Sequence, residues 1–188
     1  MEIQSNSLYL SKDEFFYSFK EQTKGITHKV FLESGRGGHY SIAAWNPFVI
    51  VKSVEEGIHI TWQNGQTEFR NGESLALVEE LINKYKLEVD SSLPPFQGGA
   101  IGFISYDYAR KIERLPQLAE DTLNVPDLYF YLFTEWAVHN VKTDEVTLMK
   151  LQQSVVDLTE WANEWEAAAT TGLHSRLFHA GKAVDVVN

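Results

Sequence analysis

The chain has 188 residues, no cysteine, and 26 acidic against 16 basic side chains, so its formal net charge is −10. This negative charge argues against a nucleic-acid-binding or anionic-membrane-binding surface, because both need clustered Lys and Arg. The lack of cysteine excludes disulfides, thiolate catalysis and cysteine metal sites. The N-terminus lacks a signal-peptide pattern, and no segment approaches the ~20 apolar residues of a membrane span. We therefore expect a soluble, cytoplasmic protein, and the length favours one large domain.

The first half of the sequence predicts a helix, several strands and a second helix. Ser11 and Glu14 have the spacing of a capping box at the start of a helix that Gly25 would end. A second helix is predicted over residues 74–86, where apolar side chains recur at helical spacing. Between the two helices, strands are predicted at 28–33, 40–45 and 47–54, followed by a hairpin at 57–70 that turns at Asn64–Gly65.

The second half predicts a further meander and a last helix. Residues 127–141 and 145–151 have the apolar, β-branched and aromatic composition of two long strands, joined at Thr143 and Asp144. An amphipathic helix is predicted over residues 154–169, and Trp161 and Trp165 favour a core or interface position rather than a cofactor site. Its apolar stripe contains Val155, Leu158, Ala162 and Trp165. The order of helices and strand groups indicates an α+β fold with helices packed on antiparallel sheets.

One glycine-rich stretch, FLESGRGGHYSIAAWNP, raises the question of a functional loop. A phosphate-binding loop needs Lys and Ser or Thr at a helix start, whereas this loop leads into a strand. A nucleophile elbow is also excluded, because Ser34 lacks the preceding glycine and the following helix. The simplest interpretation is a turn in which Gly35, Gly37 and Gly38 supply positive φ.

Composition and spacing alone assemble no active site. The six histidines show no zinc-like pair at helical spacing, so we expect each to be solvated or at the edge of the core. Paired carboxylates such as Glu79 and Glu80 fall on predicted helix surfaces, where charge usually serves solvation. No metal ligand and no cofactor-binding residue is predicted in this chain.

A second informative stretch is PPFQGGAIGFISYDYARKIERLP. Gly98, Gly99 and Gly102 interrupt a strand-like run, which indicates either close approach of a ligand or backbone, or a tightly packed central strand. Asp107 and Arg110 follow on a predicted turn or short helix. They either pair with each other or cap and anchor that turn.

These two stretches, together with VPDLYFYLFTEWAVHNVKTDEVTLM, resemble the N-terminal domain of component I of the chorismate-utilising synthases. The resemblance covers about Val30 to Leu151, and its most specific block is PFQGGAIGF followed by YD, R and an E-x-LP-type ending. The family contains anthranilate synthase and aminodeoxychorismate (para-aminobenzoate) synthase. Residues 107–140 are closer to the para-aminobenzoate branch.

The resemblance implies a two-lobed enzyme with two orthogonally packed antiparallel sheets and flanking helices. Residues 1–170 would be its N-terminal domain and residues 171–188 a linker toward a C-terminal chorismate-binding domain. In the family, ammonia from a glutamine amidotransferase, component II, replaces the chorismate 4-hydroxyl with the help of Mg²⁺. The catalytic and metal-binding residues of the family lie in the C-terminal domain, so we assign none here and expect this chain alone to be inactive.

The resemblance also implies a ligand pocket, because family members hold tryptophan near an LLES motif. The matching residues are Leu32, Glu33 and Ser34, with Tyr40, Ser41 and Ile42 as neighbours on the next strand. A hydroxyl and a carboxylate beside apolar strand residues suit an amino group and a ring. This chain departs from the family at Phe31 and in its short GRGGH loop, and Ser34 as a plain strand-end hydroxyl is the structural alternative.

Three functional hypotheses follow. The first is the N-terminal domain of aminodeoxychorismate synthase component I, a transferase of folate biosynthesis, with structural, partner-interface or ligand-pocket roles. The second is the corresponding domain of anthranilate synthase, with a tryptophan feedback site. The third is a free-standing, non-catalytic binding module. We also expect self-association, because a chain normally covered by a second lobe exposes apolar surface.

Overall fold

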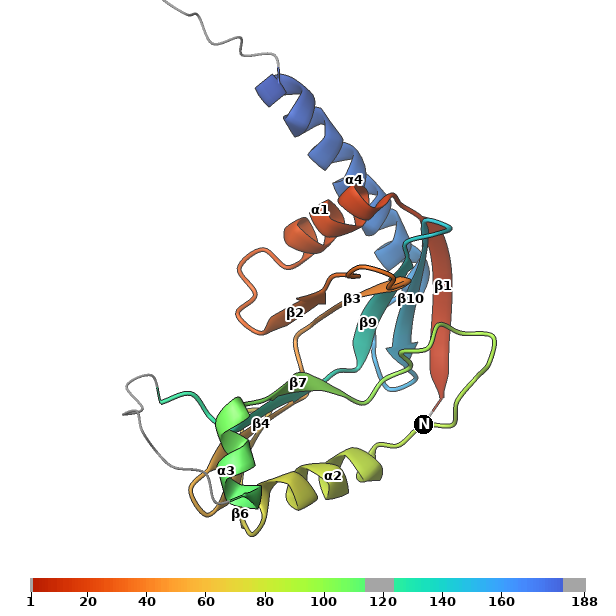
Figure 1. Ribbon diagram of the computed structural model, residues 1–188. Helices are drawn as coiled ribbons and strands as arrows, with labels where there is room; N and C mark the ends of the chain where they lie inside the picture. The colour runs from red at the N-terminus through yellow and green to blue at the C-terminus, as the bar shows by residue number, and fades with distance from the viewer. Residues whose placement is uncertain (1, 114–123, 181–188) are drawn as a thin grey trace, which may run out of the picture. The chain divides into compact units, whose positions relative to one another are not determined.

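The computed structural model describes residues 2–113 and 124–180, and side chains at 111–112 and 172–180 are not discussed (Figure 1). The chain forms two compact units from interleaved segments. One unit contains residues 46–89 and 98–134, and the other contains residues 2–45, 90–97 and those from 135 onward. Length alone favours a single domain, and the structure adds that each unit has its own sheet and its own core.

The unit that contains the N-terminus is built on a five-stranded antiparallel sheet, ordered β1-β10-β9-β3-β2. Helices α1 (Lys12–Gln22) and α4 (Leu158–Ala180) pack on one face of this sheet (Figure 1). The sequence did not predict β1, because most of its side chains are polar and do not show a strand pattern. The strand pairs with β10. The strands are β1 (Ile3–Tyr9), β2 (Lys29–Leu32), β3 (Tyr40–Trp45), β9 (Glu135–Asn140) and β10 (Glu145–Leu151).

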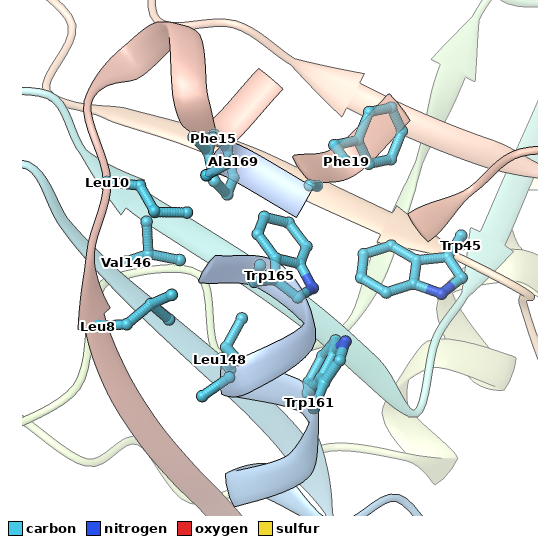
Figure 2. Packing of buried hydrophobic residues seen from close by; sticks show 13 residues of the cluster. Leu8, Leu10, Phe15, Phe19, Trp45, Val146, Leu148, Trp161, Trp165 and Ala169 are labelled. Atoms are coloured by element: carbon cyan, nitrogen blue, oxygen red, sulfur yellow. The ribbon is translucent and has the colours of Figure 1, made fainter. Parts of the chain in front are cut away.

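Large aromatic side chains fill the core between this sheet and its helices (Figure 2). Trp165 of α4 is fully buried, and its ring centroid lies 5.3 Å from that of Phe15 and 5.8 Å from that of Trp45. The core position predicted for Trp161 and Trp165 is therefore confirmed. Val155 does not join this stripe, because α4 begins at Leu158 and the Val155 side chain is fully exposed.

Local signals placed the ends of α1 correctly. The Ser11 hydroxyl accepts a hydrogen bond from the Glu14 N–H, and the Glu14 carboxylate accepts one from the Ser11 N–H. This reciprocal pair is the predicted capping box. The helix ends at Gln22, and Gly25 lies beyond it with φ of 78°.

The other unit contains a second five-stranded antiparallel sheet, ordered β6-β5-β4-β8-β7. Helix α2 (Ser74–Lys84) packs on it through Val78 and Leu81. Two short helices, η1 (Tyr106–Tyr108) and α3 (Ala109–Ile112), follow β7. The strands are β4 (Val49–Val54), β5 (Gly57–Trp62), β6 (Thr67–Asn71), β7 (Ala100–Ile104) and β8 (Leu128–Leu132).

The predicted long strand over residues 127–141 is wrong. The chain breaks at Phe133 and Thr134, so that β8 pairs with β4 and β7, whereas β9 pairs with β3 and β10 in the other sheet. Both strands are rich in apolar residues, and composition contains no signal for a change of pairing partner. The second hairpin is as predicted, with Asp144 at φ 58° in the turn between β9 and β10.

The α+β class with antiparallel sheets and packed helices is confirmed. The orthogonal packing of the two sheets stays a prediction. The assignment of residues 1–170 to a domain and 171–188 to a linker also stays a prediction, although α4 is continuous through Ala180. The Asn64–Gly65 turn is confirmed, since Gly65 has φ of 83° and its N–H donates to the Trp62 carbonyl.

The glycines before and within β7 have a backbone explanation. Gly98 and Gly99 have φ of 113° and 98°, which side-chain-bearing residues rarely adopt. A Cβ on Gly102 would lie 2.0 Å from the Tyr129 carbonyl oxygen and 2.6 Å from the Phe130 ring. Close approach of β8 therefore requires glycine at 102, which confirms the backbone-approach alternative. The other alternative, a central strand, is wrong, because β7 lies at the edge of its sheet.

We predict that Gly102→Ala destabilises the protein by at least about 1 kcal/mol, because the added methyl overlaps backbone that cannot move freely. Urea unfolding followed by circular dichroism measures this loss. The matched control is Gly35→Ala, where a Cβ meets nothing within 4 Å. Equal midpoints for Gly102→Ala and wild type would contradict the close-approach explanation.

Candidate ligand site at the end of strand β2

The six residues predicted to form the pocket lie on and just after β2 and at the start of β3, but they divide between two faces of the sheet. Leu32 and Ile42 are direct cross-strand partners and share one face, with Tyr40 on the same face two residues before Ile42. Ser41 points to the opposite face, across from His139 of β9. Leu32 and Tyr40 are 46% and 37% exposed, whereas Ser41 is buried.

Glu33 forms an ion pair with helix α1. Its carboxylate lies 2.6 Å from the Lys12 ammonium, and both side chains are more than half exposed. An exposed ion pair of this kind contributes little to stability. A ligand ammonium that approaches Glu33 competes with Lys12 for the Oε1 atom.

Ser34 has the most unusual environment of the six. Its backbone N–H donates to the Ser41 hydroxyl at 2.9 Å, which joins the end of β2 to β3. Its own Oγ is buried and has no hydrogen-bond partner among the described residues. Since a buried hydroxyl without a partner is costly, this oxygen is the feature of the site that points to a missing partner.

The glycine-rich turn folds directly over the Ser34 hydroxyl. The Gly38 N–H donates to the Gly35 carbonyl at 3.0 Å, and Gly37 has φ of 76°. A Cβ on Gly38 would lie 2.6 Å from Ser34 Oγ. The stretch is a turn, as predicted, but only Gly37 has the positive φ that was expected of all three glycines. Gly38 has a different role, because a side chain there would overlap the Ser34 hydroxyl.

His139 is a buried residue that sequence reasoning missed. It is 0% exposed, whereas each histidine was expected to be solvated or at the core edge. Its ring stacks on Phe15 with 5.1 Å between centroids, and Asp144 Oδ1 lies 3.6 Å from Nε2. Burial lowers the pKa of His139, partly offset by Asp144. Only its place opposite Ser41 on a predicted strand hinted at this position.

A second polar cluster ties η1 to the start of α2. Glu73 caps α2 by accepting from the N–H groups of Leu75 and Ala76, and it also accepts from the Tyr108 hydroxyl. Burial, with the Glu73 carboxylate beside it, raises the pKa of Tyr108 to about 12. Nearby, Arg110 Nε lies 2.8 Å from Asp107 Oδ1, so the predicted pairing of these two residues is confirmed.

Ser41 lies opposite His139 on the neighbouring strand β9, and no hydrogen bond joins the two side chains in the described part of the chain. Within residues 2–113 and 124–180, no three His, Asp or Glu side chains come together as metal ligands. No described helix is long and apolar enough to cross a membrane.

Comparison with known proteins identifies the relatives of the chain. No family model matches the sequence. Aminodeoxychorismate synthase component 1 of Bacillus subtilis (strain 168) is 38% identical over 138 residues, covering 73% of this chain and 29% of that protein. Anthranilate synthase component 1 of Acetivibrio thermocellus is 34% identical over 113 residues, covering 58% of this chain and 23% of that protein. The chain is homologous to component I of these chorismate-utilising enzymes.

A solved structure supports the same relationship. The crystal structure of anthranilate synthase component I from Streptococcus pneumoniae TIGR4 matches with a TM-score of 0.51 and 28% identity. The match covers 83% of this chain and 33% of that structure. The chain therefore spans about a third or less of the length of the relatives it matches.

The buried imidazole predicts a pH-dependent stability. The pKa of His139 is lowered in the folded chain. As the pH falls below about 6.5, the His139 imidazole is therefore protonated in the unfolded chain but stays neutral in the folded chain. Stability should then fall by up to about 1.4 kcal/mol per pH unit, an effect absent above pH 7. Urea unfolding between pH 7 and 5 measures this slope.

His139→Leu should flatten this slope, while His59→Asn, at an exposed strand position, should keep it. Asp144 and Lys12 are the charged groups that act on His139, and both are unchanged in these variants. An identical slope in His139→Leu and wild type would show that other groups set the pH dependence.

Proposed function

We propose that the chain is the N-terminal domain of an aminodeoxychorismate synthase component I, which takes part in the amination of chorismate for folate biosynthesis. The observation that carries this proposal is the 38% identity over 138 residues to the Bacillus subtilis protein. The match to the Acetivibrio anthranilate synthase is shorter and weaker, at 34% over 113 residues. This difference favours the para-aminobenzoate branch.

In this proposal the chain contributes no catalytic group. The amination, the Mg²⁺ it uses and the chorismate site belong to the part of the relatives beyond the matched region, which amounts to roughly two thirds of their length. Ammonia would come from a glutamine amidotransferase, component II. The tasks of this chain are to complete the fold of the synthase, to contribute to the component interface and to hold a ligand at the end of β2.

Anthranilate synthase component I is the second candidate, with a specific observation in its favour. The matching solved structure is an anthranilate synthase component I and covers 83% of this chain. In this case the ligand at β2 would be tryptophan acting as a feedback inhibitor. The two candidates share a fold and differ in the enzyme that the domain completes.

The proposed ligand is an amino acid, and Ser34 is its anchor. The buried Ser34 hydroxyl, which has no hydrogen-bond partner among the described residues, supplies a hydrogen bond to a polar head group. Leu32, Tyr40 and Ile42 provide an apolar face for a side chain, and Tyr40 is partly exposed there. Glu33 is the candidate partner for the ammonium once it leaves Lys12, and Ser41 holds the Ser34 backbone in place.

A domain exchange tests the assignment to a branch. In one chimera, this chain replaces the matched segment of the Bacillus subtilis aminodeoxychorismate synthase component 1, and in a second chimera it replaces that of the Acetivibrio anthranilate synthase component 1. We expect the first chimera to convert chorismate and ammonia with Mg²⁺, and the second to be at least about tenfold less active. This chain alone should show no turnover.

Both unmodified parents serve as controls for the exchange. A second chimera more active than the first would transfer the assignment to the anthranilate branch. Two inactive chimeras that are nonetheless folded by circular dichroism would contradict the proposal and favour a free-standing binding module.

Ser34→Ala tests the ligand site. Without ligand, the variant should be as stable as wild type or more stable, because it removes a buried hydroxyl that has no partner. With L-tryptophan at 100 times its Kd, wild type should gain about 2.7 kcal/mol and a higher melting temperature. Ser34→Ala should lose most of this gain, as thermal unfolding would show.

The control for this test is Ser7→Ala, at an exposed position on β1. If tryptophan leaves wild type unchanged while other amino acids stabilise it, the ligand is a different amino acid. If no amino acid stabilises wild type, the site has only a structural role. A full gain in Ser34→Ala would place the ligand elsewhere.

A further inference from the structure

Two carboxylates and one ammonium group lie beside the candidate ligand site. Lys12, the first residue of α1, forms its ion pair with Glu33 at 2.6 Å. Asp144, in the turn between β9 and β10, approaches only the imidazole of His139, with 3.6 Å between Oδ1 and Nε2. Burial lowers the pKa of His139, so this imidazole is neutral at pH 8. Among the described residues no lysine or arginine pairs with Asp144, so one of the two carboxylates has no cation.

The backbone places Lys12 close to this second carboxylate. The Leu10 N–H donates to the Asp144 carbonyl at 2.9 Å, and Lys12 follows Leu10 by two residues. Lys12 also acts electrostatically on His139, the same imidazole that the Asp144 carboxylate approaches. A lysine ammonium is held on a flexible four-carbon chain, so rotation about the side-chain bonds of Lys12 brings Asp144 within its range.

Moving Lys12 from one carboxylate to the other costs little free energy. The Lys12, Glu33 and Asp144 side chains are 53%, 59% and 57% exposed, so no burial opposes the movement. An exposed ion pair contributes little to stability, and here one exposed pair replaces another. When the ammonium of an amino acid then pairs with Glu33, both carboxylates have a cation. The arrangement therefore accommodates one additional positive charge.

We propose that Lys12 is a built-in competitor of the amino-acid ligand: it pairs with Glu33 in the free chain and transfers to Asp144 when the ligand ammonium takes Glu33. This inference rests on the proposed ligand site at the end of β2. Asp144 is then a positioning residue, because it changes the affinity for the ligand through Lys12 and without touching the ligand.

A double-mutant cycle tests the transfer, with L-tryptophan as the probe and titration calorimetry at pH 8. Asp144→Asn removes the second carboxylate and should raise the Kd by about two- to fivefold. Asparagine tolerates the φ of 58° at this position. Lys12→Gln should bind tryptophan at least as tightly as wild type, and in this background Asp144→Asn should have no effect. Lys24→Gln and Glu79→Gln, at exposed helix positions, are the matched charge controls and should leave the Kd unchanged.

A second experiment needs no ligand. Glu33→Gln removes the first carboxylate, as occupation by a ligand ammonium would. In a crystal structure of this variant at pH 8, the Lys12 Nζ should lie within about 4 Å of an Asp144 carboxylate oxygen. A Lys12 side chain that extends into solvent instead would overturn the transfer.

The outcomes separate this proposal from the proposed ligand site. If tryptophan binds wild type and Asp144→Asn weakens binding equally with and without Lys12, the competitor role is overturned while the ligand site stands. If no amino acid binds either wild type or Lys12→Gln, the ligand site itself fails, and the competitor role fails with it.

Discussion

The packing of Phe15 holds together the unit that carries the candidate ligand site. This fully buried ring lies within 5.5 Å, centroid to centroid, of Phe31, His139 and Trp165. These contacts join α1 to β2, to the sheet centre at β9 and to the long helix α4. Aromatic pairs of this kind bury large areas and add a preference for particular ring geometries. The position of β2, and with it the position of Ser34, depends on this cluster.

The packing of β2 against the core places the polar residues that follow the strand. Phe31 is partly buried and packs against the core, and three residues later the Ser34 N–H donates to the Ser41 hydroxyl. The glycine turn then closes over the Ser34 side chain. The Ser34 hydroxyl remains buried and without a hydrogen-bond partner among the described residues. A buried polar group of this kind calls for an explanation, and the proposed ligand supplies one.

The proteins that this chain resembles are much longer than the chain itself. The relatives are component I enzymes about three times as long as this chain. In the proposed function the chain contributes through surfaces and pockets, and the small polar site at β2 is a feature of that type. The glycines of the PFQGGAIGF block, which carry much of the family likeness, have a backbone role, because β8 packs against Gly102 and Gly98 and Gly99 adopt positive φ.

The sequence by itself determined the features that depend on near neighbours in the chain. The capping box at Ser11, the turn at Gly65, the two main helices and the α+β class all follow from contacts within a few residues. The similarity to the family could also be recognised from the sequence, because the glycines and turn residues that carry it are required by local backbone conformation. Of the candidate site, the residues at the end of β2 were identified, but their division between two faces of the sheet was not.

Only the tertiary structure decided which strands pair and which side chains are buried. β8 and β9 are adjacent in sequence and similar in composition, yet they join different sheets, because each strand's partners come from distant segments. His139 is fully buried for the same reason, since α1 places Phe15 over it from more than a hundred residues away. β1 is a strand because β10 pairs with it, despite its polar side chains. Strand pairing and burial are set by contacts between distant residues, and local composition contains no record of them.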